Sequence, residues 1–154
     1  MSKRRALLFF GVAVSIGAVF SITNISIARP NAQHILKTCA GENTPPNSAK
    51  RDCYAREFES IALAQGPEVA FQLLGEVQKQ DRAALGCHLI AHGIGRGTFE
   101  RDPGNWRNHL NSLTQTCSYG AVHGVIEKYV ATLPQGNLTK EVLPTICGLN
   151  PRGD

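Results

Sequence analysis

Two short segments, each joining a cysteine to a His-Gly pair, constrain this chain most. The first runs from Cys87 to Gly93 and the second from Cys117 to Gly124. In both, a β-branched apolar residue follows the His-Gly pair. Of the five histidines and five cysteines in the 154 residues, three histidines and two cysteines lie in these segments. We expect any chemistry or metal binding to be located here.

Helical spacing would bring four of these side chains into two pairs. Residues four apart share a helix face, so His88 would lie over His92, and His123 over Glu127. Three imidazoles and one carboxylate suit zinc, copper or non-haem iron, whereas calcium and magnesium prefer oxygen ligands. The spacing therefore predicts a metal site formed by His88, His92, His123 and Glu127, with Glu127 as fourth ligand or as the partner of an imidazole.

Glycines at the same spacing accompany the histidines. Gly93 and Gly97 are four apart, as are Gly120 and Gly124. Each pair would leave a stripe without side chains on its helix, and two such stripes would let backbones approach closely. Glycine inside a helix costs about 0.5–1 kcal/mol relative to alanine, so something must offset this cost. Alternatively, Gly93, Gly95 and Gly97 mark a helix end.

A structural role for the histidines is the main alternative. Helix-borne histidines in apolar segments are often core residues with one satisfied hydrogen bond. The chain lacks the His-Glu-x-x-His motif of zinc proteases and the Cys-x-x-Cys-His motif of covalently bound haem. Non-covalent haem held by a histidine pair is disfavoured because aromatic residues are only 6% of the chain.

The N-terminus has the pattern of a secretory signal. Lys3, Arg4 and Arg5 precede an apolar run from Ala6 to Phe20, and small residues around Ala28 fit cleavage there. The alternative is an uncleaved anchor over residues 6–28, which are enough to cross a bilayer. Both place the rest of the chain outside the cytoplasm, as a periplasmic, secreted or membrane-anchored protein.

Charge then excludes one class of partner. Residues 1–28 carry three basic and no acidic residues, so the net charge of +4 falls to +1 without them. We therefore expect no nucleic-acid binding, and membrane contact only through the N-terminal segment. We divide the remainder into a polar, loop-rich lead-in (29–52), one helical domain (53–148) and a tail (149–154) whose abrupt end predicts a truncated reading frame.

Outside the cytoplasm, the cysteines predict disulfides. Cys39 and Cys53 bracket a polar loop, and Cys87 and Cys117 occupy matching places in the two His-Gly segments, so we pair them in this way. Thiolate ligation of a metal by Cys87 and Cys117 is the alternative. Cys147 is left over, without an assigned partner.

Apolar residues recur at helical spacing along most of the chain, and no segment alternates as a strand does. Asp52 is an expected N-cap, Gly66 an expected stop, Pro67 a helix start and Asp81 the cap of a helix that carries both His88 and His92. Further helices are expected over residues 106–113, 118–132 and 138–146. The fold class is an all-α bundle of short helices or helical hairpins, stapled by disulfides.

Two functions remain open at this point. The first is an extracytoplasmic metal-binding protein whose activity, and whether it is an enzyme, the pattern leaves undetermined. The second is an extracytoplasmic helical interaction domain with structural histidines and an unidentified protein partner. The first requires His88, His92 and His123 to converge, whereas the second predicts diverging histidines and an exposed apolar patch.

Overall fold

The computed structural model describes residues 30–41, 48–113, 115–134, 144 and 146. This part of the chain is all-helical and has no strand, as the sequence predicts. Its α-helices are α1 (Ala32–Thr38), α2 (Ser48–Gln65), α3 (Pro67–Gln78), α4 (His88–Arg101), α5 (Trp106–Ser112) and α6 (Gly120–Ala131). Two 3-10 turns, η1 (Arg82–Ala84) and η2 (Pro103–Asn105), precede α4 and α5. The expected signal, the tail and Cys147 lie outside the described residues.

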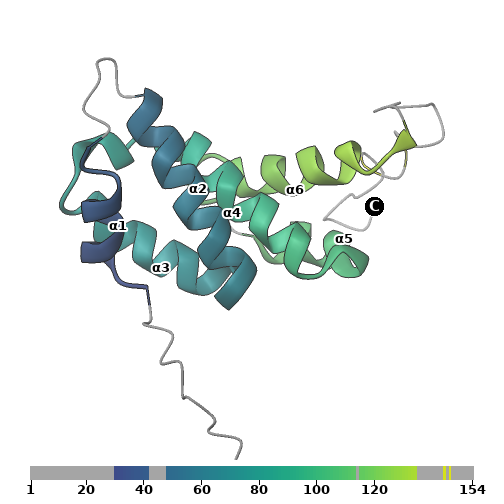
Figure 1. The fold of residues 1–154 in the computed structure, drawn as a ribbon. Coiled ribbons are helices and arrows are strands. Elements are labelled where there is room, and N and C mark those ends of the chain that lie inside the picture. Colours follow the sequence, from purple (N-terminus) through teal and green to yellow (C-terminus); the bar gives the residue numbers. More distant parts are fainter. Residues whose placement is uncertain (1–29, 42–47, 114, 135–143, 145, 147–154) are drawn as a thin grey trace, which may run out of the picture.

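Helix α4 is the central element of the fold. It makes its most extensive contacts with α2 on one side and with α6 on another (Figure 1). Helix α3 packs against α1 and α2, and α5 lies beside α6 and the end of α4. All three histidines of the His-Gly segments therefore lie on the central helix or on its neighbour α6.

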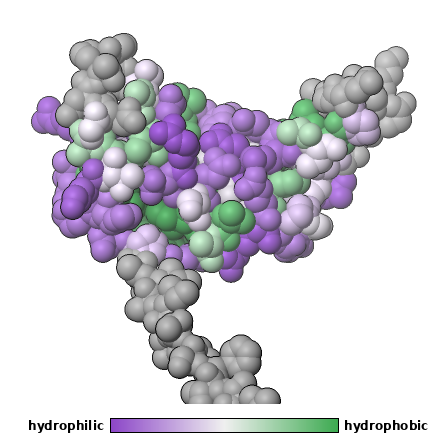
Figure 2. All heavy atoms as spheres, in the orientation of Figure 1, coloured by the Kyte–Doolittle hydropathy of each residue, from purple (hydrophilic) through white to green (hydrophobic). Residues whose placement is uncertain are grey.

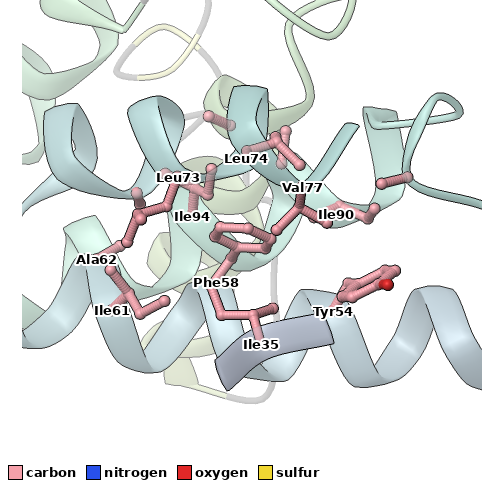
Figure 3. Close-up of a cluster of buried hydrophobic side chains, with 14 of the residues drawn as sticks. Ile35, Tyr54, Phe58, Ile61, Ala62, Leu73, Leu74, Val77, Ile90 and Ile94 are labelled. Carbon is pink, nitrogen blue, oxygen red and sulfur yellow. The ribbon is translucent and has the colours of Figure 1, made fainter. Parts of the chain in front are cut away.

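The hydrophobic core fills the space between α1, α2, α3 and α4. Figure 3 shows Phe58 of α2 at the middle of this cluster, with Ile35 of α1 on one side and Val77 of α3 on the other. Ile90 and Ile94 reach the cluster from α4 and are fully buried. This core holds the face of α4 that points away from the histidines, because residues four apart share a face.

Backbone-to-backbone contact joins α4 to α2. A Cβ atom on Gly93 would lie 2.0 Å from the carbonyl oxygen of Ala55, and one on Gly97 would lie 2.2 Å from that of Glu59. No side chain fits in such a gap, so the two helices touch through their main chains. The close packing against α2 offsets the helical cost of both glycines.

A second set of backbone contacts joins α4 to α6. A Cβ on Gly95 would lie 1.9 Å from the carbonyl oxygen of Ala121. From the α6 side, Cβ atoms on Gly120 and Gly124 would lie 2.2 Å and 2.1 Å from the carbonyl oxygens of His88 and His92. The two glycine stripes thus do not face each other as their spacing suggested, because Gly93 and Gly97 face α2 instead.

Three helix boundaries differ from the sequence expectation. The glycines do not end α4, which continues to Arg101 because α2 and α6 hold it on both sides. Asp81 caps η1, where its Oδ1 accepts from the Ala83 N–H at 2.8 Å, and α4 begins only at His88. Asp52 lies inside α2, which begins at Ser48.

Two cysteine pairs are at disulfide distance. Cys39, at the end of α1, lies with its Sγ 2.01 Å from that of Cys53 in α2. Cys87 immediately precedes α4, and its Sγ lies 2.08 Å from that of Cys117 in the segment leading to α6. Helix α1, within the lead-in expected to be loop-rich, is thereby fastened to α2.

Polar side chains cover most of the face seen in Figure 2, and hydrophobic residues form small separate areas on it. The exposed large hydrophobic residues of the described part are Leu63, Leu85, Leu89 and Tyr119. Among the described helices, none combines the length and the apolar character needed to cross a membrane.

We predict that Gly93→Ala lowers the free energy of unfolding by about 1–3 kcal/mol, because its methyl group would overlap the α2 backbone and force the helices apart. Gly75→Ala in α3 is the matched control, since a Cβ there meets no atom within 4 Å. It should stabilise the protein by about 0.5–1 kcal/mol through helix propensity alone. Chemical denaturation followed by circular dichroism measures both, and equal effects would contradict the backbone contact.

Candidate metal centre

The side chains of His88, His92 and His123 converge at the contact between α4 and α6. One ligand atom from each lies within 4.8 Å of the other two. The ring centroids are 5.0–5.6 Å apart, with the rings edge to face. His88 and His92 are half-buried and His123 is exposed, so the cluster opens to solvent on the α6 side. The convergence expected for a metal site is therefore present.

Two of the three imidazoles are held from behind by an acceptor. His88 Nδ1 lies 3.1 Å from the carbonyl oxygen of Cys117, and His92 Nδ1 lies 3.3 Å from Oε2 of Glu127. A carbonyl or a carboxylate can only accept, so each Nδ1 carries the hydrogen. An imidazole whose hydrogen is on Nδ1 presents the lone pair of Nε2, which is the form that binds a metal.

These two lone pairs point at the same place. The Nε2 atoms of His88 and His92 are 3.3 Å apart. Two unprotonated nitrogens at this distance repel each other unless a proton or a cation lies between them. Two imidazole nitrogens bound to one tetrahedral ion at 2.0–2.1 Å would be about 3.3–3.4 Å apart. The observed separation therefore matches that of two ligands of one ion.

Glu127 lies behind His92 and is not one of the three converging groups. Its Oε2 contacts the outer nitrogen of the ring, and its side chain is 54% exposed. Of the two roles considered for Glu127, this position agrees with orienting an imidazole. A carboxylate there also increases the basicity of the ring as a ligand.

A network of ion pairs fixes Glu127 in turn. Arg96 lies one helical turn beyond His92 and donates from Nη1 to Glu127 Oε2 at 3.4 Å. Its Nε donates to Glu59 Oε2 of α2 at 2.8 Å. Lys128 of α6 also bonds to Glu100 of α4. These charges link α2, α4 and α6 on the side of the bundle next to the histidines.

Burial lowers the pKa of His92 below its ordinary value. The hydrogen bond to Glu127 opposes this shift, while repulsion from His88 and His123 adds to it. Lowering the pKa favours the neutral ring, because the charged form loses hydration in a half-buried position. His92 therefore remains a competent ligand to lower pH than an exposed histidine would.

The segment between α5 and α6 has an unusual backbone. Cys117, Ser118 and Tyr119 have φ angles of 58°, 53° and 62°, three consecutive residues in the left-handed region. For residues with a side chain this region costs about 1–2 kcal/mol each. This turn ends at Gly120, where α6 begins, and so explains why α6 starts later than residue 118. It also aims the Cys117 carbonyl at His88.

The remaining two histidines lie elsewhere. His34 is exposed on α1, and His109 of α5 has its Nε2 3.9 Å from Asp102 Oδ2. Neither belongs to the cluster. Sequence reasoning thus identified the three histidines that converge but missed two groups that contact or support them. Arg96 could have been found from its i+4 spacing to His92, whereas no side-chain pattern indicates the Cys117 carbonyl.

No protein-family model, curated protein or solved structure matches this chain. The chemistry of the cluster is therefore argued from its geometry. Three imidazoles from two packed helices, two of them with the Nδ1 hydrogen fixed by an acceptor, can hold a transition metal. The same hydrogen bonds and the two disulfides are also compatible with a rigid helical interaction domain.

We predict that Ser118→Gly raises the free energy of unfolding by about 0.5–1 kcal/mol, because glycine adopts a positive φ without steric cost. The matched control is Ser60→Gly, at an exposed position inside α2. There glycine should destabilise by about 0.5 kcal/mol. Denaturant titrations of the two variants give the comparison, and a destabilising Ser118→Gly would argue against a left-handed turn.

Proposed function

We propose that this chain is an extracytoplasmic helical protein that binds one divalent transition metal through His88, His92 and His123. The observation that carries this proposal is the 3.3 Å separation of two Nε2 atoms whose rings are each held at Nδ1 by an acceptor. Core histidines need one hydrogen bond each and have no reason to point two lone pairs at each other. A shared proton would remove that repulsion within the pair alone, whereas a shared cation would also account for the third imidazole, His123, which converges with the other two.

Zinc is the ion that the geometry favours, ahead of copper and iron. Zinc takes tetrahedral sets of imidazoles, whose nitrogens are about 3.3–3.4 Å apart. Copper(II) prefers a square arrangement, in which neighbouring ligand atoms would be about 2.9 Å apart at similar bond lengths. The His88–His92 pair of Nε2 atoms, at 3.3 Å, fits the tetrahedral case, and the His123 nitrogen, which lies within 4.8 Å of the other two, would move inward to join them. Three neutral ligands also leave the charge of the ion uncompensated, and Glu127 lies close enough to His92 to offset part of it.

Three histidines leave one tetrahedral position for water or another ligand. An ion with such an open position can lower the pKa of bound water or bind a substrate oxygen. His123 is exposed, so this side of the cluster is accessible from solvent. Storage, sensing and hydrolysis all use sites of this kind, and the proposal is limited to metal binding with one exchangeable position.

The extracytoplasmic location is supported by two observations. Disulfides persist in oxidising compartments, and the two cysteine pairs are at bonding distance. The N-terminal residues have the charge and hydropathy pattern of a signal or an anchor. A periplasmic, secreted or membrane-anchored protein would acquire its metal from that compartment.

The test is zinc titration by calorimetry of tag-free protein previously treated with a chelator, with His123→Ala and His34→Ala as a matched pair. Both residues are exposed, but only His123 belongs to the cluster. We expect one zinc per chain in the parent protein and in His34→Ala. His123→Ala should lose more than the roughly 10- to 100-fold in affinity that removal of an outer partner causes.

Two results would overturn the proposal. The first is a parent protein that binds no zinc, copper or iron yet unfolds cooperatively, which would favour the helical interaction domain. The second is equal loss of zinc binding in both variants, which would show that the metal is held somewhere other than the cluster.

Glu127→Gln provides a separate prediction about the role of this carboxylate. If Glu127 orients His92, the amide oxygen still accepts from Nδ1–H, so one zinc per chain should still bind, about 10-fold more weakly. Glu127→Ala should approach a 100-fold loss. Glu76→Gln on α3 is the control and should leave the affinity unchanged. A loss with Glu127→Gln as large as that of His123→Ala would instead make Glu127 a ligand.

A further inference from the structure

We infer that the Cys87–Cys117 disulfide positions His88 for metal binding, so that tight binding requires this pair to be oxidised. The inference rests on the proposed function and adds a condition to it. His88 is linked to both cysteines of this disulfide. Cys87 directly precedes it in the chain, and the carbonyl oxygen of Cys117 accepts a hydrogen bond from its ring.

The bond fixes the distance across this unit. The Cα atoms of Cys87 and Cys117 are 5.3 Å apart. The segment that carries Cys117 also contacts α4 where Gly120 packs against the His88 carbonyl. His88 Nδ1 lies 3.1 Å from the Cys117 carbonyl oxygen, and the disulfide holds this cysteine beside the start of α4. The disulfide thus determines where the His88 ring finds its acceptor.

The left-handed turn makes the position of Cys117 dependent on this bond. Three consecutive residues at φ angles of 58°, 53° and 62° persist only where surrounding contacts hold them. Within the turn, the Cys117 carbonyl accepts from the Gly120 N–H at 3.1 Å, and the Tyr119 carbonyl accepts from the His123 N–H at 3.0 Å. Ser118 and Tyr119 are exposed, so within the turn it is Cys117 that is anchored, by the disulfide and by packing against the core.

Reduction would release that constraint. A dithiol supplies two electrons and two protons, the Sγ–Sγ bond breaks, two thiols form, and the dithiol becomes a disulfide. Ser118 and Tyr119 can then return to ordinary φ values, which moves the Cys117 carbonyl away from His88. Without its acceptor, the ring of His88 is free to rotate and to exchange tautomers, and its affinity for a metal falls.

This coupling gives the metal site an order of assembly. In a reducing cytoplasm the pair is open and the site binds weakly. After export, oxidation closes the pair and completes the site, so the metal is taken up from the outer compartment. The Cys39–Cys53 pair lies on α1 and α2 and has no such link to the histidines.

The experiment compares zinc affinity in two variants that each lack one pair. Cys87→Ala/Cys117→Ala removes the bond without leaving thiols that could bind zinc themselves, and Cys39→Ala/Cys53→Ala is the matched control. In all proteins Cys147 is replaced by serine, so that it cannot exchange with either pair. We expect the first variant to bind zinc about 10- to 100-fold more weakly than the parent, and the control to bind as the parent does.

A second measurement keeps the test valid if Cys87→Ala/Cys117→Ala fails to fold. The Cys39→Ala/Cys53→Ala protein retains only the pair beside the site, which can be reduced with dithiothreitol and then blocked with iodoacetamide. Circular dichroism reports whether the helices persist. Zinc affinity should fall on reduction and blocking while helicity is retained, and reoxidation of an unblocked sample should restore it.

A third variant tests whether the conformation of the turn affects zinc affinity when the disulfide is absent. Adding Ser118→Gly to Cys87→Ala/Cys117→Ala removes part of the strain without restoring the disulfide. If strain in the turn displaces the carbonyl of residue 117, this glycine should recover part of the lost zinc affinity. Adding Ser60→Gly instead should recover none.

The outcomes separate this inference from the proposed function. A parent protein without zinc binding refutes the proposed metal site and this inference together. Tight, one-to-one zinc binding that is unchanged in folded Cys87→Ala/Cys117→Ala leaves the metal site intact and refutes only the role of the disulfide. Equal losses in both cysteine variants would reduce the effect to general stability and would also refute it.

Discussion

Direct contact between helix backbones is the constraint on which the rest of this structure depends. Helix α4 touches α2 through Gly93 and Gly97, and touches α6 through Gly95 and two glycines of α6. Main-chain atoms cannot change size as side chains can, and these contacts leave no space for a side chain between the helices. The glycines of α6 lie against the carbonyls of His88 and His92, so the same contact that joins the helices brings the third histidine to the first two.

The polar groups around the histidines form a second, outer level of organisation. The contacts run from the ring of His92 through Glu127 and Arg96 to Glu59 on α2. His88 is held differently, by a backbone carbonyl in a turn that a disulfide restrains. One imidazole is thus oriented by charge and another by chain geometry, so the two respond to different disturbances. Ionic strength acts on the first and redox state on the second.

Much of this arrangement could be predicted from the sequence. The all-α class followed from apolar periodicity, the cysteine pairs from their spacing, and the three histidines from the i+4 rule across two similar segments. The direction that each glycine faces could not be predicted. Gly93 and Gly97 contact α2 because the core residues Ile90 and Ile94 fix the rotation of α4, and this depends on the packing of four helices together.

The groups that hold the imidazoles from behind were harder to predict than the three histidines themselves. The acceptor of His88 is a main-chain oxygen whose direction depends on three left-handed residues, none of them glycine or asparagine. Residue type gives no warning of such a turn. Asp81 was expected to cap the helix that carries His88 and His92. It caps the 3-10 turn η1 instead, which ends at Ala84, and α4 begins separately at His88. Capping residues and apolar periodicity thus predicted that these helices exist, whereas packing between helices determined where each one begins and ends.

The side chains that hold the helices together are distinct from those that meet at the cluster. Glycines and buried aliphatic residues fix α4 and α6, whereas His88, His92 and His123 project from the contact without filling it. The scaffold should therefore accept other donor atoms at these three positions, such as a thiolate or a carboxylate, with little movement of the backbone. The chemistry presented at this contact could then be changed by exchanging these three side chains alone.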